Sequence, residues 1–322
     1  MNVFVIGLGS MGKRRIAILR KFSFGIIGID HNHERCKEVN ERYNIETRDS
    51  LDDCYVNNGD CAFVCTSPLS HNTIIHNCLI RGLHVFTEIN LVSDGYTDNI
   101  QLAKEKNLVL FLSSTFLYRN ETQYMIERVR TAKRPVSYIY HVGQYLPDWH
   151  PWESYQSFFV GNKKTNGCRE IFAIELPWIV SCFGKIKSVI VKKQKLSNLQ
   201  LKYDDAYLVM LQHENGTNGI MAVDVVSRNA VRKIEVYGED IYLTWSGVPD
   251  TVFDYDINEK ILRNIEFEMS EHKEGYAEFV SENPYREEVR AFMDCIVNPS
   301  KTSKWSFEKD LEILGIIDRI EA

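Results

Sequence analysis

The stretch that decides the fold is Met1-Asn-Val-Phe-Val-Ile-Gly7-Leu-Gly9-Ser10-Met11-Gly12-Lys-Arg. Its apolar residues predict a β-strand that ends at Gly7, and the apolar spacing after Gly12 predicts a helix. In this setting the G-x-G-x-x-G spacing predicts a dinucleotide site. Gly7 permits the tight turn, Gly9 lets the backbone approach a pyrophosphate, and Gly12 lets helix and strand pack closely. Ser10 and Met11 open the helix, whose N-terminus attracts phosphates.

A second apolar strand, Phe24-Gly-Ile-Ile-Gly-Ile29, ends at Asp30. This acid follows Gly12 by about 18 residues, close to the roughly 20 of the dinucleotide fingerprint. A carboxylate there binds the free ribose 2′-hydroxyl of NAD and repels the 2′-phosphate of NADP. The next residues, His31-Asn32-His33, include no arginine for such a phosphate. We therefore expect NAD as the cofactor, with NADP disfavoured.

The bulk properties indicate a two-domain globular protein with no nucleic-acid partner. The chain has 322 residues, 44% hydrophobic and 25% charged, with a net charge of −6. This length suits two domains, and this charge gives no footprint for nucleic acid or an anionic membrane. We interpret the basic cluster Lys13-Arg14-Arg15 as a solvated helix face or a neighbour of the phosphates.

Cysteine usage and hydropathy indicate a cytoplasmic location. No apolar run approaches the ~18 residues that span a bilayer, and the first strand occupies the place of a signal peptide. The eight cysteines form no C-x-x-C pair, so we expect reduced, buried thiols. The nine histidines are scattered, and we expect no metal site.

Strand and helix alternate from residue 1 to about 117, which predicts a doubly wound parallel sheet. Beyond a helix at about 120–131, alternating and β-branched runs predict a large, mostly antiparallel sheet with one face covered by the helix around 168–183. We thus expect an α/β protein with a dinucleotide-binding Rossmann domain at 1–118. An α+β domain for substrate binding and oligomerisation would follow at 119–322.

Turn signals and the chain end complete this prediction. Asn215-Gly216 and Asn218-Gly219 are interpreted as turns that join 206–213 to 220–227 in a hairpin. Two closing helices are expected, from Glu288 to Val297 and from Phe307 to Ile320.

Several motifs resemble the Gfo/Idh/MocA family of nicotinamide-dependent oxidoreductases. They are the threonine–proline–histidine stretch Thr66-Ser67-Pro68-Leu-Ser-His71, the segment Gly82-Leu-His84-Val-Phe-Thr-Glu88, and Phe116-Leu-Tyr-Arg119-Asn. The resemblance implies hydride transfer between NAD and a CH–OH group of a sugar, a sugar nucleotide or a related polyol. It also implies a set of residues beside the cofactor in addition to the glycine loop and Asp30: Thr66, Ser67, Pro68, His71, Glu88 and Asn90.

Two departures from the family pattern affect the acid–base chemistry. The family usually reads E-K-P where this chain reads Glu88-Ile89-Asn90, and isoleucine cannot exchange a proton. The family's helical aspartate is replaced by Glu170, and its histidine position falls on Ile174 or Glu175. The family's usual acid–base groups therefore cannot be carried over to this chain.

An irregular polar and aromatic stretch from His141 to Glu170 supplies other acid–base candidates. His150 is the first, because imidazole titrates near neutral pH; the alternative is a packing role in a loop rich in Trp and Pro. Glu170 would act with a raised pKa, or it forms an ion pair with Arg169 or a lysine. Glu175 lies about 140° from Glu170 around a helix, so both cannot easily face one substrate.

Three further side chains have weaker claims. Lys163 would replace the absent family lysine; the alternative is a solvated lysine in a loop. Tyr145 would donate a proton, against a buried, hydrogen-bonded role. Cys168, near a helix start where a thiol pKa falls, would be reactive, against a small packing residue.

Candidates for substrate contact are two arginines and three aromatic residues. Arg119 and Arg228 would each bind a phosphate or carboxylate of the substrate. The alternative for both is a structural ion pair. Trp149, Trp152 and Tyr155 would stack on a sugar or base ring.

Two other functions remain open at this stage. One is an NAD-retaining epimerase, lyase or glycosidase-type enzyme. The other is a non-catalytic NAD-binding protein, which the absence of the family lysine would explain. The family resemblance also implies a homodimer or homotetramer formed through the open face of the second sheet.

Overall fold

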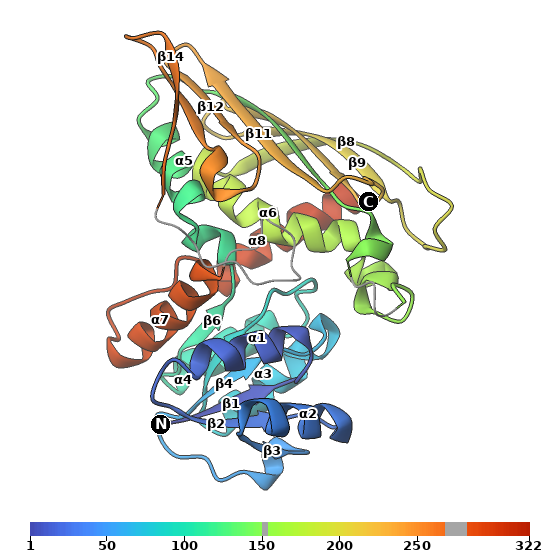
Figure 1. The fold of residues 1–322 in the computed structure, drawn as a ribbon, viewed down its shortest axis with the longest axis vertical. Helices are drawn as coiled ribbons and strands as arrows, with labels where there is room; N and C mark the ends of the chain where they lie inside the picture. The colour runs from blue at the N-terminus through green and yellow to red at the C-terminus, as the bar shows by residue number, and fades with distance from the viewer. Residues whose placement is uncertain (150–153, 268–281) are drawn as a thin grey trace. The chain divides into compact units, whose positions relative to one another are not determined.

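A computed structural model describes residues 1–149, 154–267 and 282–322. By their contacts these residues form two compact units (Figure 1). The first comprises Met1–Ser114 and Tyr285–Glu312, and the second comprises Thr115–Pro284 and Ile313–Ala322. Residues 285–312, which the sequence analysis placed with the second domain, thus make their contacts with the first.

The first unit is a six-stranded parallel sheet in the order β3-β2-β1-β4-β5-β6, flanked by helices. This order is that of a dinucleotide-binding doubly wound sheet, with the switch point between β1 and β4. The strands are β1 (Asn2–Ile6), β2 (Gly25–Ile29), β3 (Glu46–Arg48), β4 (Cys61–Val64), β5 (His84–Thr87) and β6 (Leu110–Leu112). The helices are α1 (Ser10–Leu19), α2 (His33–Tyr43), α3 (His71–Ile80), α4 (Tyr96–Glu105) and α7 (Asn283–Val297).

The core of this unit combines the central strands with a helix from near the chain end. Phe63 of β4, Phe86 of β5 and Phe111 of β6 each lie within 5.7 Å, between ring centroids, of Phe292 in α7. Helix α7 is therefore part of the hydrophobic core of the first unit.

The second unit is built on an eight-stranded sheet in the order β14-β13-β12-β11-β7-β10-β9-β8. All its pairings are antiparallel except the parallel pair β7–β10. The strands are β7 (Ser137–Gly143), β8 (Ile186–Gln194), β9 (Ala206–His213), β10 (Asn218–Asp224), β11 (Val231–Gly238), β12 (Ile241–Trp245), β13 (Phe253–Asp256) and β14 (Ile261–Asn264). The helices are α5 (Asn120–Arg130), α6 (Gly167–Phe183) and α8 (Phe307–Glu321), the last of which begins in the first unit.

Helix α6 covers one face of this sheet, as predicted, and packs against β9 and β10 (Figure 1). The alternation of the strands follows from this arrangement. In β7, Tyr138 and Tyr140 are buried toward α6, where they contact Phe183 and Trp178, while Ile139 is 48% exposed on the opposite face.

The predicted hairpin is confirmed, but one of its two predicted turns is wrong. Asn215-Gly216 turns the chain, with Gly216 at φ +87°. Asn218 and Gly219 instead begin β10. Gly219 is needed there for space, because a Cβ atom would lie 2.0 Å from Cζ of Tyr138 on the neighbouring strand.

Candidate functional site

The glycine loop has the geometry that a pyrophosphate needs. Gly7 follows β1 at φ +93°, a conformation that favours glycine. A Cβ atom on Gly12 would lie 1.9 Å from the carbonyl oxygen of Gly7, so the helix could not approach the strand with any larger residue. A Cβ on Gly9 would meet nothing within 4 Å, which leaves open space at the loop surface.

The start of α1 completes this cradle. Ser10 is exposed and Met11 half-buried at its first two positions. No side chain caps the helix, and no acid lies in its first turn. Backbone N–H groups at such an end attract phosphate through hydrogen bonds and the helix dipole. The residues present therefore fit the pyrophosphate of a dinucleotide.

Asp30 lies at the end of β2 and supports the glycine loop. Its Oδ2 accepts a hydrogen bond of 2.8 Å from the backbone N–H of Leu8, and its Oδ1 accepts one of 2.9 Å from that of Asn32. Arg35 in α2 lies 3.7 Å from the same carboxylate. The sequence analysis missed this arginine because it considered only the three residues after Asp30.

His71 links the segments that follow β4 and β5. Its Nε2 lies 3.0 Å from the backbone oxygen of Thr66, and its Nδ1 lies 2.6 Å from Oδ1 of Asn90. Burial lowers the pKa of His71, and the contacts with Asn90 and Thr66 oppose this shift. Ser67 and Pro68 form the turn between, where Pro68 starts a short 3-10 helix. His71 and Asn90 thus hold together the segments that follow β4 and β5. Their assignment as cofactor contacts stays a prediction.

The segment Glu88-Ile89-Asn90 directs its two polar side chains inward. Glu88 and Asn90 are buried, while Ile89 between them is half-exposed. The carboxylate of Glu88 is bound by Arg15, with Nε at 2.6 Å from Oε1. Because this carboxylate is already paired, the structure favours a structural role for the side chain of Glu88 over direct cofactor binding.

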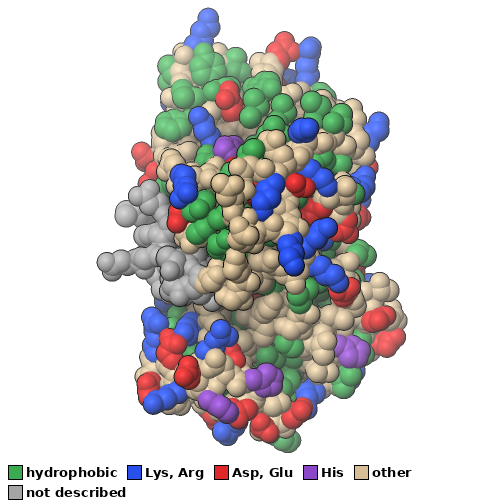
Figure 2. Space-filling view, turned by 90° about the vertical axis from the view of Figure 1, so that its right-hand side faces the viewer, with side chains coloured by type: hydrophobic (Ala, Val, Ile, Leu, Met, Phe, Trp, Pro, Cys, Tyr) green, Lys and Arg blue, Asp and Glu red, His purple; other side chains and the backbone are tan. Residues whose placement is uncertain are grey.

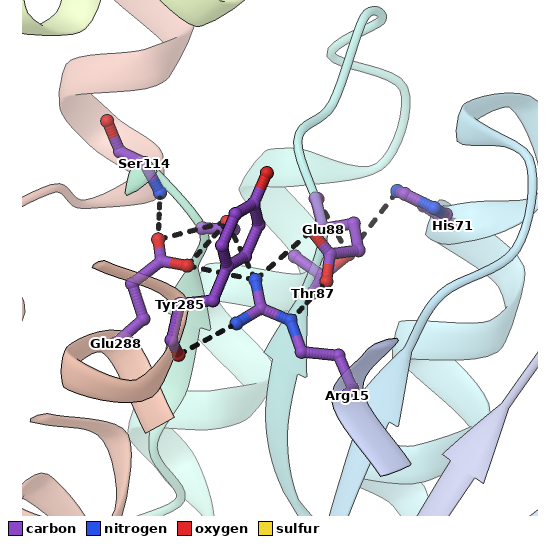
Figure 3. A network of polar contacts seen from close by, with 8 residues as sticks. Arg15, His71, Thr87, Glu88, Ser114, Tyr285 and Glu288 are labelled. Atoms are coloured by element: carbon purple, nitrogen blue, oxygen red, sulfur yellow. Dashed lines mark hydrogen bonds and ion pairs between the residues drawn. The ribbon is translucent and has the colours of Figure 1, made fainter. Parts of the chain in front are cut away.

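Arg15 is the centre of a buried polar network (Figure 3). Its Nη2 donates to Glu288 of α7 at 2.9 Å, and its Nη1 donates to the backbone oxygen of Tyr285 at 3.2 Å. Glu288 also accepts from the backbone N–H of Ser114 at 2.7 Å. Burial alone lowers the pKa of Arg15, but the charges of Glu88 and Glu288 raise it above its usual value. The prediction of a solvated basic face is wrong for Arg15, whose side chain is fully buried.

Glu170 lies in the first turn of α6, and one of its oxygens has no partner among the described residues. Asn166 caps this helix by accepting from the N–H of Arg169 at 2.8 Å. The guanidinium of Arg169 binds Asp318 and Glu321 instead of Glu170. Oε2 of Glu170 is shielded from solvent and makes no hydrogen bond to the described residues. Burial raises the pKa of Glu170 to about 8, a value suited to proton exchange near neutral pH.

Glu175, one and a half turns further along α6, is fully paired. Its Oε1 lies 2.9 Å from Nη2 of Arg232, and its Oε2 accepts from Trp178 Nε1 at 2.7 Å and from the hydroxyl of Tyr140. The side chain is completely buried. These contacts favour a structural role for Glu175 over the catalytic one.

The aromatic stretch is described in part. His150 and Trp152 lie outside the described residues. The ring of Tyr145 faces the guanidinium of Arg228, 3.6 Å from centroid to Cζ. Trp149 is half-buried, and its Nε1 donates to the backbone oxygen of Gln144 at 3.2 Å. Tyr145 and Trp149 therefore lie on the loop that follows β7, and their roles stay predictions.

Three other candidates lie around the start of α6. Tyr155 accepts a hydrogen bond from the N–H of Gln200 at 3.2 Å. Lys163 is exposed, which favours the solvated position. Cys168 is completely buried, and burial raises its thiol pKa well above the usual value. A thiol so protected favours the packing role over the reactive one.

Arg119 is held by structural partners. It forms an ion pair of 2.7 Å with Glu121, donates to the backbone oxygen of Gly247 at 3.0 Å, and lies over the rings of Phe116 and Trp245. Its side chain is only 3% exposed. This environment favours structural ion pairing over a substrate clamp.

Within residues 1–149, 154–267 and 282–322, no three His, Cys, Asp or Glu side chains are grouped to hold a metal ion. Of the helices in this same part of the chain, none has the length and apolar character needed to cross a bilayer.

Comparison with solved structures shows the fold along the whole chain. A UDP-N-acetylglucosamine 3-dehydrogenase of Acidithiobacillus ferrooxidans matches with a TM-score of 0.76 at 16% identity, covering 100% of this chain and 96% of that one. A levoglucosan dehydrogenase, in complex with NADH and levoglucosan, matches with 0.79 at 16%, covering 99% and 96%. A biliverdin reductase of Synechocystis, with biliverdin and NADP⁺, matches with 0.74 at 18%, covering 99% and 97%.

No curated protein matches the chain. The family model described as an oxidoreductase family with an NAD-binding Rossmann fold matches residues 1–114. This range contains the glycine loop, Asp30 and the segment Glu88–Asn90, so the match and the geometry concern the same site. Residues 1–114 are therefore similar to the NAD-binding Rossmann domain of the Gfo/Idh/MocA oxidoreductases, and the likeness of the rest of the chain to the solved structures concerns the fold.

Proposed function

We propose that this protein transfers a hydride between NAD and the CH–OH carbon of a sugar, a sugar nucleotide or a related polyol. The observation that carries the proposal is the glycine loop at the uncapped start of α1, within a domain of the oxidoreductase family. Two proteins of the same fold are named as dehydrogenases of levoglucosan and of UDP-N-acetylglucosamine, which supports a carbohydrate-type substrate.

Asp30 supports NAD over NADP. Its carboxylate lies at the end of β2, where the fingerprint acid binds the ribose 2′-hydroxyl, and a 2′-phosphate would be repelled. Arg35 is already directed toward Asp30 at 3.7 Å. We expect Asp30→Ala to lower the preference for NAD over NADP, measured as the ratio of the two dissociation constants.

Glu170 is the proposed acid–base group. When bound, the nicotinamide accepts or gives the hydride, and a protein group must take or give the hydroxyl proton. Glu170 is supported by its unpartnered, shielded oxygen and by its raised pKa. Its carboxyl group gives a proton in carbonyl reduction and takes one in alcohol oxidation. Ile89 offers no proton in place of the family lysine.

A homodimer or homotetramer is proposed through the open face of the second sheet. Ile190, Met210, Ile220 and Ile139 are direct neighbours on four adjacent strands. Their side chains are 44–69% exposed, and hydrophobic side chains are visible over this sheet in the upper part of Figure 2. A second copy would bury this row. Met210→Lys should shift the mass measured by light scattering to that of the monomer.

A cytoplasmic location is proposed from the thiols. All eight cysteines are free, which is typical of proteins from a reducing compartment.

Turnover assays test the proposed reaction. Purified protein is screened with NAD or NADP against sugars, sugar nucleotides and polyols, and absorbance at 340 nm is followed. Net NADH formation or consumption with a carbohydrate supports the proposal. Product formation without net NADH would instead identify an NAD-retaining enzyme. NAD binding with no turnover of any substrate would contradict hydride transfer.

A further inference from the structure

Arg15 is a cation of α1, the helix that follows the glycine loop, and its side chain is directed into the interior of the first unit. It lies three residues after Gly12 in α1, and its guanidinium is completely buried. The guanidinium packs over the ring of Phe86, 4.5 Å from the centroid. A charge so deeply buried requires partners, since an unpaired one is strongly unfavourable.

Its partners all come from the other half of the sheet or from α7. Glu88 follows β5, Ser113 follows β6, and Glu288 and Tyr285 belong to α7 (Figure 3). In the strand order β3-β2-β1-β4-β5-β6, β1 and α1 belong to the first mononucleotide half, and β5 and β6 belong to the second. Arg15 therefore joins the two halves.

This connection matters because a dinucleotide contacts both halves at once. The first half takes the adenosine and pyrophosphate, and the second takes the nicotinamide end. The separation of α1 from the segment Glu88–Asn90 then decides whether both ends of one ligand fit together. We propose that Arg15 is a positioning residue of the cofactor site, which holds the segment after β5 at the correct place relative to the pyrophosphate-binding helix.

The geometry requires an arginine. The Nε, Nη1 and Nη2 atoms of Arg15 donate in separate directions, to Glu88, to the backbone of Tyr285 and to Glu288. The single nitrogen of a lysine cannot reach all three acceptors. Glu288 is itself fixed by the N–H of Ser114 and the hydroxyl of Ser113.

The test compares a ligand of both halves with a ligand of the first half. Dissociation constants of NAD and of ADP are measured by calorimetry for the wild type and for Arg15→Lys, which keeps the charge. We expect the constant for NAD to rise about tenfold, as for one lost charge-assisted hydrogen bond, and that for ADP to stay within about twofold. Arg20→Lys, at the exposed end of the same helix, is the matched control and should change neither constant.

Two results would overturn the proposal. Equal loss of NAD and ADP affinity would mean that Arg15 only stabilises the fold, and unchanged NAD affinity would mean that it positions nothing. Should Arg15→Lys fail to fold, Glu288→Gln gives the same decision, because it retains an acceptor for Ser114 but weakens the hold on Arg15. The inference rests on the proposed nicotinamide cofactor, whose failure is distinguishable: the wild type itself would then bind neither NAD nor NADP.

Discussion

Buried carboxyl groups in the two units have opposite surroundings. In the first unit, Glu88 and Glu288 share the guanidinium of Arg15 and further donors. In the second unit, Glu170 has an oxygen that is equally shielded from water but has no hydrogen-bond donor among the described residues. Burial raises the pKa of Glu288, but Arg15 and Ser113 oppose this rise, whereas burial alone acts on Glu170 and raises its pKa to about 8. Burial alone therefore does not distinguish these acids, and the missing partner of Glu170 is the reason why we propose it as the acid–base group.

The largest effect is expected on the turnover rate when the unpartnered acid, Glu170, is replaced. Glu170→Gln keeps the shape of the side chain but removes its titration, and we expect the turnover rate to fall by about 10²–10⁴-fold. The wild-type rate of alcohol oxidation should rise with pH through about 8, and this limb should vanish in the variant. The measurement is steady-state kinetics between pH 6 and 10, with NAD affinity as the control. Full activity would place the acid–base group elsewhere, with His150 as the next candidate.

Replacement of Glu175, the paired acid on the same helix, should lower the free energy of unfolding. Glu175→Gln removes the charge that compensates the buried Arg232, and breaking such a pair costs about 3–5 kcal/mol. Urea denaturation measures the loss in the free energy of unfolding. Glu170→Gln is the matched control, since it breaks no ion pair among the described residues. Equal stability of the two variants would contradict the distinction between the paired and unpaired acids.

A smaller effect concerns stability against pH. Burial raises the pKa of Glu170 from an ordinary 4.5 to about 8, so the folded chain holds this proton more tightly than the unfolded chain. The contribution to stability is complete below pH 4.5, decreases as the pH rises, and is lost above about 8. The melting temperature of the wild type should therefore fall relative to that of Glu170→Gln between pH 5 and 9. A constant difference would show that Glu170 ionises normally in the folded protein.

Asp310 sharpens the comparison as an intermediate case. It accepts hydrogen bonds from Tyr96 at 2.6 Å and from Trp305 at 3.0 Å but is paired with no cation in the part of the chain that the structure describes, and burial raises its pKa to about 6. As for Glu170, the pKa is higher in the folded than in the unfolded chain. The contribution of Asp310 to stability is therefore lost as the pH rises through about 6. A titration of its carboxyl signal by NMR should give a midpoint near 6, between those of a paired acid and Glu170. A midpoint near 4 would show that two neutral donors are sufficient.

The smallest effect is expected at Cys168. Its thiol is buried and its pKa is raised, so a thiol reagent should label it only on unfolding. Cys168→Ala should leave the turnover rate within about twofold, because no reacting thiolate is lost. Rapid labelling of the native protein, read by mass spectrometry of its peptides, would contradict this.

Local patterns were sufficient for the Rossmann unit and its glycine loop. Gly7, Gly9 and Gly12 act through their own backbone, so their spacing alone identifies the turn. The hairpin turn at Asn215-Gly216 is local in the same way. In contrast, Asn218-Gly219 has the same letters but lies in a strand, where Gly219 pairs with Tyr138 and Leu211 and leaves room for the ring of Tyr138.

The site was less predictable wherever partners are distant in the sequence. Arg15 was interpreted as part of a solvated helix face or as a neighbour of the phosphates, because its partner Glu288 is far along the chain and nothing near Arg15 signals it. The same holds for Glu175, whose cation Arg232 lies on β11. For Glu170 the sequence supplied the residue but not its isolation, since only the structure shows that Arg169 pairs with other acids.

Residues 285–312 are synthesised late but belong to the first unit, which has a consequence for folding during translation. When the ribosome has made residues 1–114, the strands of the parallel sheet are complete, but Phe292 and Glu288 do not yet exist. The aromatic rings of Phe63, Phe86 and Phe111 then lack a neighbour, and Arg15 lacks one of its two carboxylates. The final packing of the N-terminal unit therefore requires residues from near the end of the chain. Until these are synthesised, part of its apolar core lacks its cover, and such exposed apolar surface favours aggregation.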